Sequence, residues 1–161
     1  MKLIRPILHA IHGIIWPFIA IRTSIEGYSM LPTLHPGELL LFDRLCYTTV
    51  FPKRSDIIII RNAWNTQRDY IKRIVGIPGD RIMLKGNVLT VNETTYTWPP
   101  SHISNTLQEG FWTLAENDYV LLGDNLAYST DSRSNGPINL NSILGKARMV
   151  YWPLSRTRTL N

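Results

Sequence analysis

The sequence has few of the residues that form cross-links or bind metals. Among its 161 residues there is one cysteine, Cys46, so an intrachain disulfide is impossible and no cluster of thiolates can hold a metal. Cys46 follows an apolar run, which favours a packed structural thiol over a nucleophile. With 44% hydrophobic residues the chain still has enough apolar material for a core, which excludes disorder throughout. Its length indicates one domain.

The sequence also lacks an apolar run of the usual length for crossing a bilayer. Residues 7–21 form the longest such run, interrupted by two histidines and a proline, whereas a span needs about 20 apolar residues. A short or tilted membrane helix, an interfacial anchor and a cleavable secretory signal all stay open, although no small-x-small cleavage pattern follows. We expect residues 1–22 to be a short hydrophobic helix that anchors the chain. Basic residues at its start would keep the N-terminus cytoplasmic and the remainder on the outer face of the cell membrane.

Basic residues outnumber acidic ones, 17 to 12, but the sequence has no long basic run. A net charge of +5 favours anionic partners, including phospholipid headgroups and nucleic acid. A β-barrel that binds nucleic acid would need clustered basic and aromatic side chains on one face of the sheet. Because the basic residues are scattered, we expect no nucleic acid as a partner, whereas the apolar N-terminal segment predicts membrane lipid as one.

Beyond residue 25 the pattern is that of short β-strands, and no stretch has a convincing helical period. A Lys-Gly-Asn turn predicts a hairpin, whereas residues 94–117 are polar and aromatic and are expected to form a loop. The sequence therefore predicts a mostly β fold, a folded sheet or barrel of short antiparallel strands over residues 23–155, followed by a tail at 156–161. The expected strands lie at residues 38–44, 56–61, 69–77, 81–84, 88–91, 119–122 and 146–152.

The first candidate site segment is a turn around Ser29. Gly27 precedes the serine and Pro32 follows it, a setting that exposes a hydroxyl at the end of a strand. Glycine there would let the backbone of a substrate approach closely. Taken alone, this segment is more typical of a polar loop serine.

The second candidate segment places Lys72 inside an apolar strand. Burial disfavours the charged form of a lysine, whose pKa is normally about 10.4, and a neutral amine can act as a general base near about pH 7 to 8. Strand alternation puts Tyr70 and Ile74 on the face of Lys72, and Ile71 and Arg73 on the other. A surface lysine on an edge strand is the alternative that this segment alone leaves open.

The third candidate segment follows the sixth of the expected strands and contains hydroxyls, carboxylates and an arginine. Ser129 could hydrogen-bond a neutral lysine and orient it. The segment also allows an ion pair between Asp131 and Arg133, or one between Asp124 and Arg73. A generic turn rich in Asp and Asn is the alternative.

Together, in this order and spacing, the three segments resemble the bacterial type I signal peptidases, also called leader peptidases. Ser29–Leu34 matches the serine motif of that family. Lys72–Asp80 matches its lysine motif without a gap, and Gly123–Arg133 matches its third motif. Residues 81–92 look like the hairpin that follows in the family, and the resemblance covers roughly residues 20–153.

The resemblance implies a membrane-associated, monomeric serine endopeptidase that removes signal peptides from secreted preproteins and cleaves after small residues of the Ala-x-Ala type. Ser29 would be the nucleophile and Lys72 the general base, forming an acyl-enzyme that water hydrolyses, without a metal or other cofactor. Ser129 would hydrogen-bond and position the Lys72 amine. Met30 would pack beside the lysine stem. A supporting framework would be formed by Arg73, Asp124, Asp131 and Arg133. Pockets for small side chains would be lined by Ile25, Leu34, Tyr70 and Ile71.

The sequence departs from the family pattern at Gly27. Some members carry a hydroxyl residue there that donates to the oxyanion, so the donors in this chain would be the Ser29 backbone N–H and nearby main chain. One lost donor is worth about 3 kcal/mol. The stretch between the second and third motifs is also short, which indicates a minimal catalytic core.

Two other functions and one other catalytic pair are compatible with parts of the pattern. Self-cleaving repressors share a Ser–Lys dyad, but they carry a DNA-binding domain and no apolar anchor. A catalytically silent module that captures peptides by strand addition would be expected to lack the dyad. A serine–histidine pair would have to use His35, which lies in a proline-rich turn six residues from Ser29, or His102, which lies in a loop with no acidic partner nearby to orient it.

Overall fold

The structure is a computed structural model, and it describes residues 20–61, 64, 68–98 and 109–160. The hydrophobic helix expected at residues 1–22 lies almost wholly outside these ranges. Among the residues that are described, no helix has the length and apolar character needed to cross a membrane.

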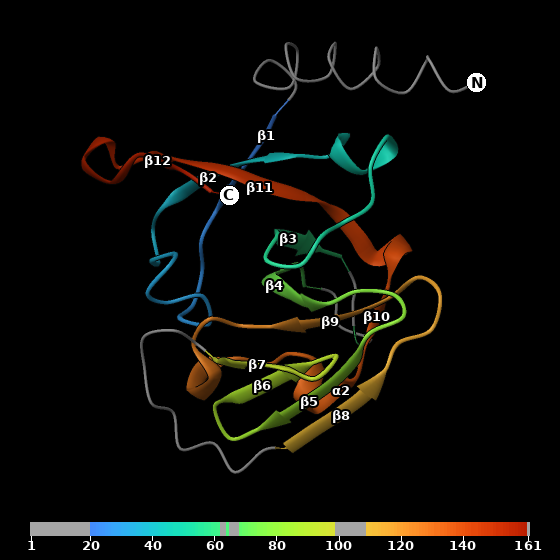
Figure 1. Cartoon of the computed structure of the whole chain (residues 1–161). Helices are drawn as coiled ribbons and strands as arrows, with labels where there is room; N and C mark the ends of the chain where they lie inside the picture. The colour runs from blue at the N-terminus through green and yellow to red at the C-terminus, as the bar shows by residue number, and fades with distance from the viewer. Residues whose placement is uncertain (1–19, 62–63, 65–67, 99–108, 161) are drawn as a thin grey trace.

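Two antiparallel sheets make up the fold (Figure 1). The larger runs in the order β1-β2-β11-β3-β4-β9-β10, with β12 paired to β11, and the smaller runs β7-β6-β5-β8. The strands of the larger sheet are β1 (Ile21–Ser24), β2 (Leu39–Asp43), β3 (Ile57–Ile60), β4 (Tyr70–Gly76), β9 (Asp118–Leu122), β10 (Ile138–Asn139), β11 (Ile143–Trp152) and β12 (Arg158–Thr159). Those of the smaller sheet are β5 (Arg81–Lys85), β6 (Val88–Val91), β7 (Thr94–Thr97) and β8 (Glu109–Thr113).

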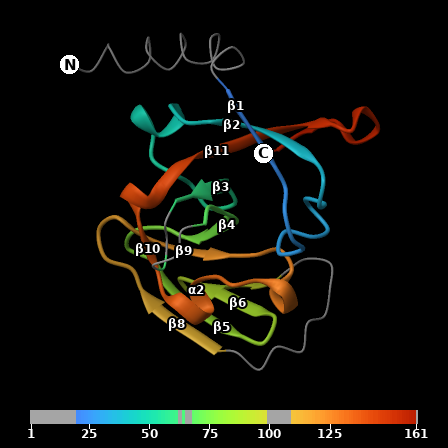
Figure 2. The same ribbon diagram turned by 180° about the vertical axis from the view of Figure 1, so that it is seen from behind.

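The described helices are all short and lie in connections between strands. They are η1 (Cys46–Thr48), η3 (Leu126–Tyr128), α2 (Ser132–Asn135), η4 (Leu140–Ser142) and η5 (Leu154–Arg156). Seen from behind in Figure 2, α2 and the loop before it lie at the same end of the molecule as the smaller sheet. The mostly β prediction is therefore confirmed for the described residues.

Strand β3 consists of four consecutive isoleucines, all of which are buried. Such a run is typical of a strand covered on both faces, since β-branched side chains pack well on a pleated surface. Ile57 and Ile59 belong to a core cluster with Met30 and residues of β2 and β11, whereas Ile58 and Ile60 pack with residues of β9. Strand β3 is therefore covered on both faces, and in the sheet it lies between β11 and β4.

The smaller sheet corrects one expectation and confirms another. The hairpin of β5 and β6 forms as predicted, with Lys85 opposite Val88. Residues 94–117, expected to be a loop, contribute β7 and β8 to this sheet, so that part of the prediction was wrong. Both strands are largely exposed, so their sequences do not carry the apolar signal of a core strand.

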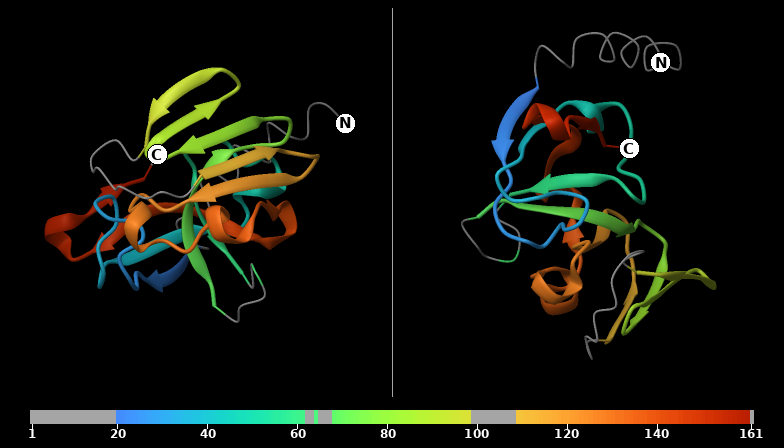
Figure 3. Two further views of the ribbon diagram at one scale, coloured as in Figure 1. Left: turned by 90° about the horizontal axis from the view of Figure 1, so that it is seen from below. Right: turned by 90° about the vertical axis from the view of Figure 1, so that its left-hand side faces the viewer.

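The C-terminal residues belong to the folded domain. Strand β12, which the sequence prediction placed in a tail, pairs with β11, with Thr159 opposite Met149. Leu160 is buried in the same core cluster as Met30. Figure 3 shows this end of the chain, in red, against the sheet that carries β1 and β2.

Candidate active site

The segment that carries Ser29 is a turn after β1, held against a second loop. The N–H of Asn125 donates to the carbonyl of Ser29 at 2.9 Å, and Leu34 N donates to Met30 O to close a further turn. Gly27 has a φ of 76°, a left-handed conformation that glycine adopts at no steric cost. The turn thus presents the serine hydroxyl, while Met30 beneath it is buried in the core.

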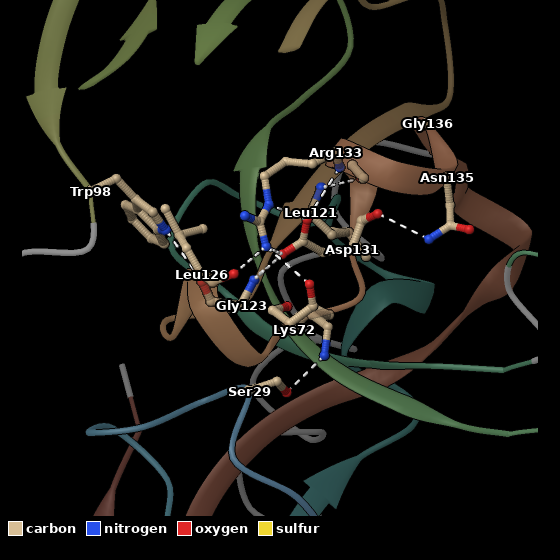
Figure 4. A network of polar contacts seen from close by, with 12 residues as sticks. Ser29, Lys72, Trp98, Leu121, Gly123, Leu126, Asp131, Arg133, Asn135 and Gly136 are labelled. Carbon is tan, nitrogen blue, oxygen red and sulfur yellow. Dashed lines mark hydrogen bonds and ion pairs between the residues drawn. The ribbon is translucent and has the colours of Figure 1, made fainter. Parts of the chain in front are cut away.

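Lys72 points at this serine from β4, as Figure 4 shows. Its Nζ lies 2.9 Å from Ser29 Oγ and donates to the Ile71 carbonyl at 3.0 Å. The reach between the two side chains that the sequence predicted is therefore present. In the sheet Lys72 is opposite Ile58 of β3, so it lies in an interior strand and not on an exposed edge.

The electrostatic setting of Lys72 favours a neutral amine. The residue is only 2% exposed, and this burial lowers its pKa from 10.5 to about 8. Asp131 and Asp124 oppose the shift in pKa, and Arg133 adds to it. The Tyr70 ring lies 5.4 Å from Nζ, on the same face of β4, as strand alternation predicts. A substantial fraction of the amine is thus unprotonated in mildly alkaline solution.

A buried ion pair joins two side chains of the third segment. Arg133 Nε lies 2.8 Å from Asp131 Oδ1, and both side chains are almost fully buried. Arg133 also donates to the carbonyls of Leu126 and Ser129, and Asp131 accepts from the N–H of Gly123 at 3.1 Å (Figure 4). These contacts fix the loop that faces the serine turn.

A second ion pair ties the loop to the lysine strand. Arg73, the neighbour of Lys72, binds both carboxylate oxygens of Asp124, at 2.9 and 2.6 Å. Its other nitrogen donates to the carbonyl of Ser55. Both ion pairs allowed by the sequence are therefore formed, and together they set the third segment relative to β4.

Ser129 does not make the contact expected of it. Its Oγ is buried and has no hydrogen-bond partner among the described residues, so it does not bond Lys72. The Lys72 amine instead donates a hydrogen bond to the carbonyl of Ile71. A Cβ on Gly123 would collide with Ser129 Oγ and come within 2.5 Å of the Ser29 carbonyl oxygen. Glycine at this position is what allows the two loops to approach so closely.

A cleft of about 270 Å³ opens beside the Ser29 and Lys72 side chains. Four of the five residues expected to contact substrate line it: Ile25, Gly27, Tyr70 and Ile71. The cleft is also lined by Thr23, Ser24, Glu26, Ser29, Met30, Phe42, Ile59, Asp69 and Lys72. Among the described strands, β1 is the end strand of the larger sheet, so the cleft runs along an edge that no other described strand covers. This edge was missed because the apolar run before it had been assigned to an anchor reaching residue 22.

Leu34 does not line the cleft, which corrects the sequence prediction. It is fully buried in the core with Leu40 and Val150, because the turn that begins at Met30 points it inward. Leu34 thus supports the serine turn from below.

The far side of the serine turn is held by the C-terminal strand. Arg158 of β12 donates to both carboxylate oxygens of Glu38, at 2.9 and 2.8 Å, and to the carbonyl of Thr33 at 2.5 Å. The Glu38 side chain is buried and also accepts from the N–H of His35. Burial raises the pKa of the Glu38 carboxyl, but the Arg158 and His35 hydrogen bonds outweigh it and the pKa lies below its usual value. No signal in the sequence pointed to this contact.

The alternative nucleophile and the alternative base find little support. Cys46 is buried, and burial raises its pKa to about 12, as expected for a packed thiol. His35 makes its hydrogen bond through the backbone to Glu38, and His102 lies outside the described residues. No group of three or more histidine, cysteine or acidic side chains that could hold a metal occurs in the part of the chain that the structure describes.

Comparison with known proteins shows the family to which the chain belongs. Residues 1–152 match the family model described as signal peptidase, peptidase S26. Signal peptidase I of Bacillus caldolyticus is 35% identical over 153 residues, which cover 86% of this chain and 83% of that relative. Signal peptidase IB of Staphylococcus aureus strain Mu50 is 29% identical over 160 residues, covering 88% and 83%.

A solved structure gives the same result for the fold. The signal peptidase I of Enterococcus faecalis V583 superposes with a TM-score of 0.50 at 26% identity, over 59% of this chain and 95% of that one. Fold and sequence thus agree, and the chain belongs to the signal peptidase family, peptidase S26, as a type I member and hence a serine endopeptidase.

Proposed function

We propose that this enzyme removes N-terminal signal peptides from secreted preproteins, with Ser29 as nucleophile and Lys72 as general base. One observation supports this more than any other. A buried lysine whose pKa is lowered to about 8 lies 2.9 Å from the serine hydroxyl. Such an amine can accept the serine proton near neutral pH, which an exposed lysine does poorly.

The proposed reaction has two halves. Lys72 Nζ takes the proton from Ser29 Oγ as the oxygen attacks the scissile carbonyl carbon, and the ammonium then protonates the departing amine nitrogen. An ester between Ser29 and the signal peptide remains. The neutral amine next deprotonates a water, which attacks the ester carbon, and the proton returns to Ser29 as the acid product leaves. This sequence needs no metal or organic cofactor.

The developing oxyanion needs hydrogen-bond donors beside Ser29. Among the described residues, the N–H of Ser29 has no hydrogen-bond acceptor and is therefore available. Gly27 carries no hydroxyl to add a second donor, and a single donor of this kind is worth about 3 kcal/mol of transition-state stabilisation. We therefore propose that main-chain N–H groups stabilise the oxyanion in this enzyme.

The cleft supports a substrate with small side chains before the scissile bond. Its volume is about 270 Å³, and it combines a strand edge that no other described strand covers with apolar side chains such as Ile25 and Ile71. An extended peptide can add to such an edge through main-chain hydrogen bonds, with alternate side chains entering the cleft. Ala-x-Ala fits this arrangement because its two small side chains point the same way.

Membrane association is part of the proposal and is supported by the sequence. The N-terminal apolar segment would anchor the chain with the N-terminus in the cytoplasm, and the catalytic domain, which the structure extends from β1 to β12, would lie on the outer face. Lipid would be the second partner, and the enzyme would act as a monomer.

The test is cleavage of a preprotein with an Ala-x-Ala site by the full chain in detergent, from about pH 6 to 10. Because the neutral amine is the active form, kcat/KM of the wild type should rise with pH through an apparent pKa of about 8. Ser29→Ala and Lys72→Met should lose cleavage while staying folded, and Lys53→Met, which alters an exposed lysine, should behave like the wild type. Cleavage by both dyad variants at the wild-type rate would refute the assignment.

A further inference from the structure

Two exposed tyrosines form a pair beside the nucleophile. Tyr28 comes directly before Ser29, and Tyr128 comes directly before Ser129. Their ring centroids are 6.3 Å apart and the rings are inclined by 65°, an edge-to-face contact. Tyr28 is 58% exposed and Tyr128 is 70% exposed, so the pair buries little surface and contributes little to the core.

The pair is fixed at the point where the two site loops join. Tyr28 O accepts from Leu31 N in the serine turn, and Asn125 O accepts from Tyr128 N in the second turn. The two turns are connected directly by the hydrogen bond from Asn125 N to Ser29 O. Figures 1 and 3 show the two loops, in blue and orange, side by side. The tyrosines are therefore held in place by the same contacts that place the nucleophile.

A hollow of about 390 Å³ lies between the same two turns. It is lined by Leu31, Pro32, His35, Asp124 and Asn125. The cleft that contains Ser29 and Lys72 is lined by none of these residues and by neither tyrosine. The two recesses thus share no lining residue, and the volume of the hollow falls in the range of about 300–1,000 Å³ typical of ligand sites.

A peptide cleaved at Ser29 has to continue in both directions from the scissile bond. If its signal-peptide side occupies the cleft along β1, the residues after the bond leave on the other side of the serine turn. The aromatic pair and the largely apolar hollow belong to the two joined turns but do not line the cleft, and such surfaces favour an apolar or aromatic side chain over a charged one.

We propose that Tyr28 and Tyr128, with the hollow beside them, form a subsite for the first residues of the mature protein, and that it selects an apolar or aromatic side chain among the three residues after the scissile bond. The inference rests on the proposed function, because it takes Ser29 as the nucleophile. It adds a determinant of specificity on the product side of the bond.

The experiment compares peptides that share an Ala-x-Ala site and differ only after it, with phenylalanine, leucine, alanine or aspartate at the first, second or third following position. The full chain in detergent is assayed as wild type, Tyr28→Ala, Tyr128→Ala and Tyr128→Phe. Phe111→Ala is the matched control, since Phe111 is an equally exposed aromatic residue on β8 of the smaller sheet.

At one position the wild type should favour phenylalanine over alanine by about two- to tenfold in kcat/KM, the range expected for one aromatic contact. Both Tyr→Ala variants should lose this ratio, while Tyr128→Phe and Phe111→Ala keep it. A purely structural role would lower cleavage of all peptides equally and leave the ratio intact, which would overturn the subsite while leaving the proposed function standing. If the wild type cleaves none of the peptides, the proposed function and the subsite both fall.

Discussion

Replacing Lys72 with methionine should abolish activity and yet stabilise the folded enzyme near neutral pH. In the wild type, burial lowers the pKa of this lysine from 10.5 to about 8. At about 1.4 kcal/mol per pH unit, the charged amine is disfavoured in the folded state by about 3 kcal/mol. Methionine has a similar shape and no charge, so the variant is free of this cost.

The size of the effect depends on pH in a defined direction. Below about pH 8 the lysine is protonated in both the folded and the unfolded chain, so the buried charge destabilises the folded state by the full amount. Between about pH 8 and 10.5 the folded chain loses the proton first, so wild-type stability rises with pH. Above 10.5 the amine is neutral in both states and the cost is gone.

The variant also loses the hydrogen bonds of Lys72 to Ser29 and Ile71, each worth about 1 kcal/mol. We therefore expect Lys72→Met to be more stable than the wild type by about 1–3 kcal/mol at pH 7, and less stable by about 1–2 kcal/mol above pH 10.5. Denaturant unfolding of the full chain in a nonionic detergent, followed by circular dichroism, measures both values. Lys53→Met is the control for replacing a lysine on the surface.

The reasoning would be refuted if Lys72→Met were destabilised equally at pH 7 and above pH 10.5. That result would mean that the amine is not held in a site that disfavours its charge. A low activity of the variant could then reflect loss of structure and not loss of a base.

Two further substitutions test the surroundings of the dyad. Gly123→Ala places a methyl group 2.5 Å from the Ser29 carbonyl oxygen, so we expect kcat to fall at least about tenfold and stability by about 1–3 kcal/mol; unchanged kinetics would show that the two loops need not touch. Arg158→Ala leaves the buried Glu38 carboxylate without its main partner and should destabilise the enzyme by about 2 kcal/mol. Adding Glu38→Gln should restore part of that loss, and a simple sum of the two single effects in thermal unfolding would argue against the pair.

The sequence predicted the central part of the fold well, because its strands are buried. The run Ile57–Ile60 and the apolar pattern around Lys72 reflect strands covered on both faces, and such patterns are strong signals. β7 and β8 were missed because they expose most of their side chains and depend on pairing with β5 and β6, which local sequence does not encode.

The candidate site was predicted from its motifs, and the errors concern individual side chains. The motifs identify Ser29 and Lys72, but they do not show which way a neighbouring side chain points. Leu34 turns into the core, and the Ser129 hydroxyl stays beside Gly123 without a partner in the described structure. Both outcomes follow from the packing of two loops that are distant in sequence, which a single sequence does not reveal.

The bond between Glu38 and Arg158 also has a consequence for biosynthesis. These residues are 120 positions apart, and a ribosome adds about 5–20 residues per second, so the serine turn is made roughly 6–24 s before the arginine that secures it. Throughout that interval the buried carboxylate has no Arg158 to neutralise it. We therefore expect the serine turn of a growing chain to be held less firmly until synthesis has passed residue 158. Arrested nascent chains that end before and after residue 158 would show whether protection of the serine turn from proteolysis rises at that point.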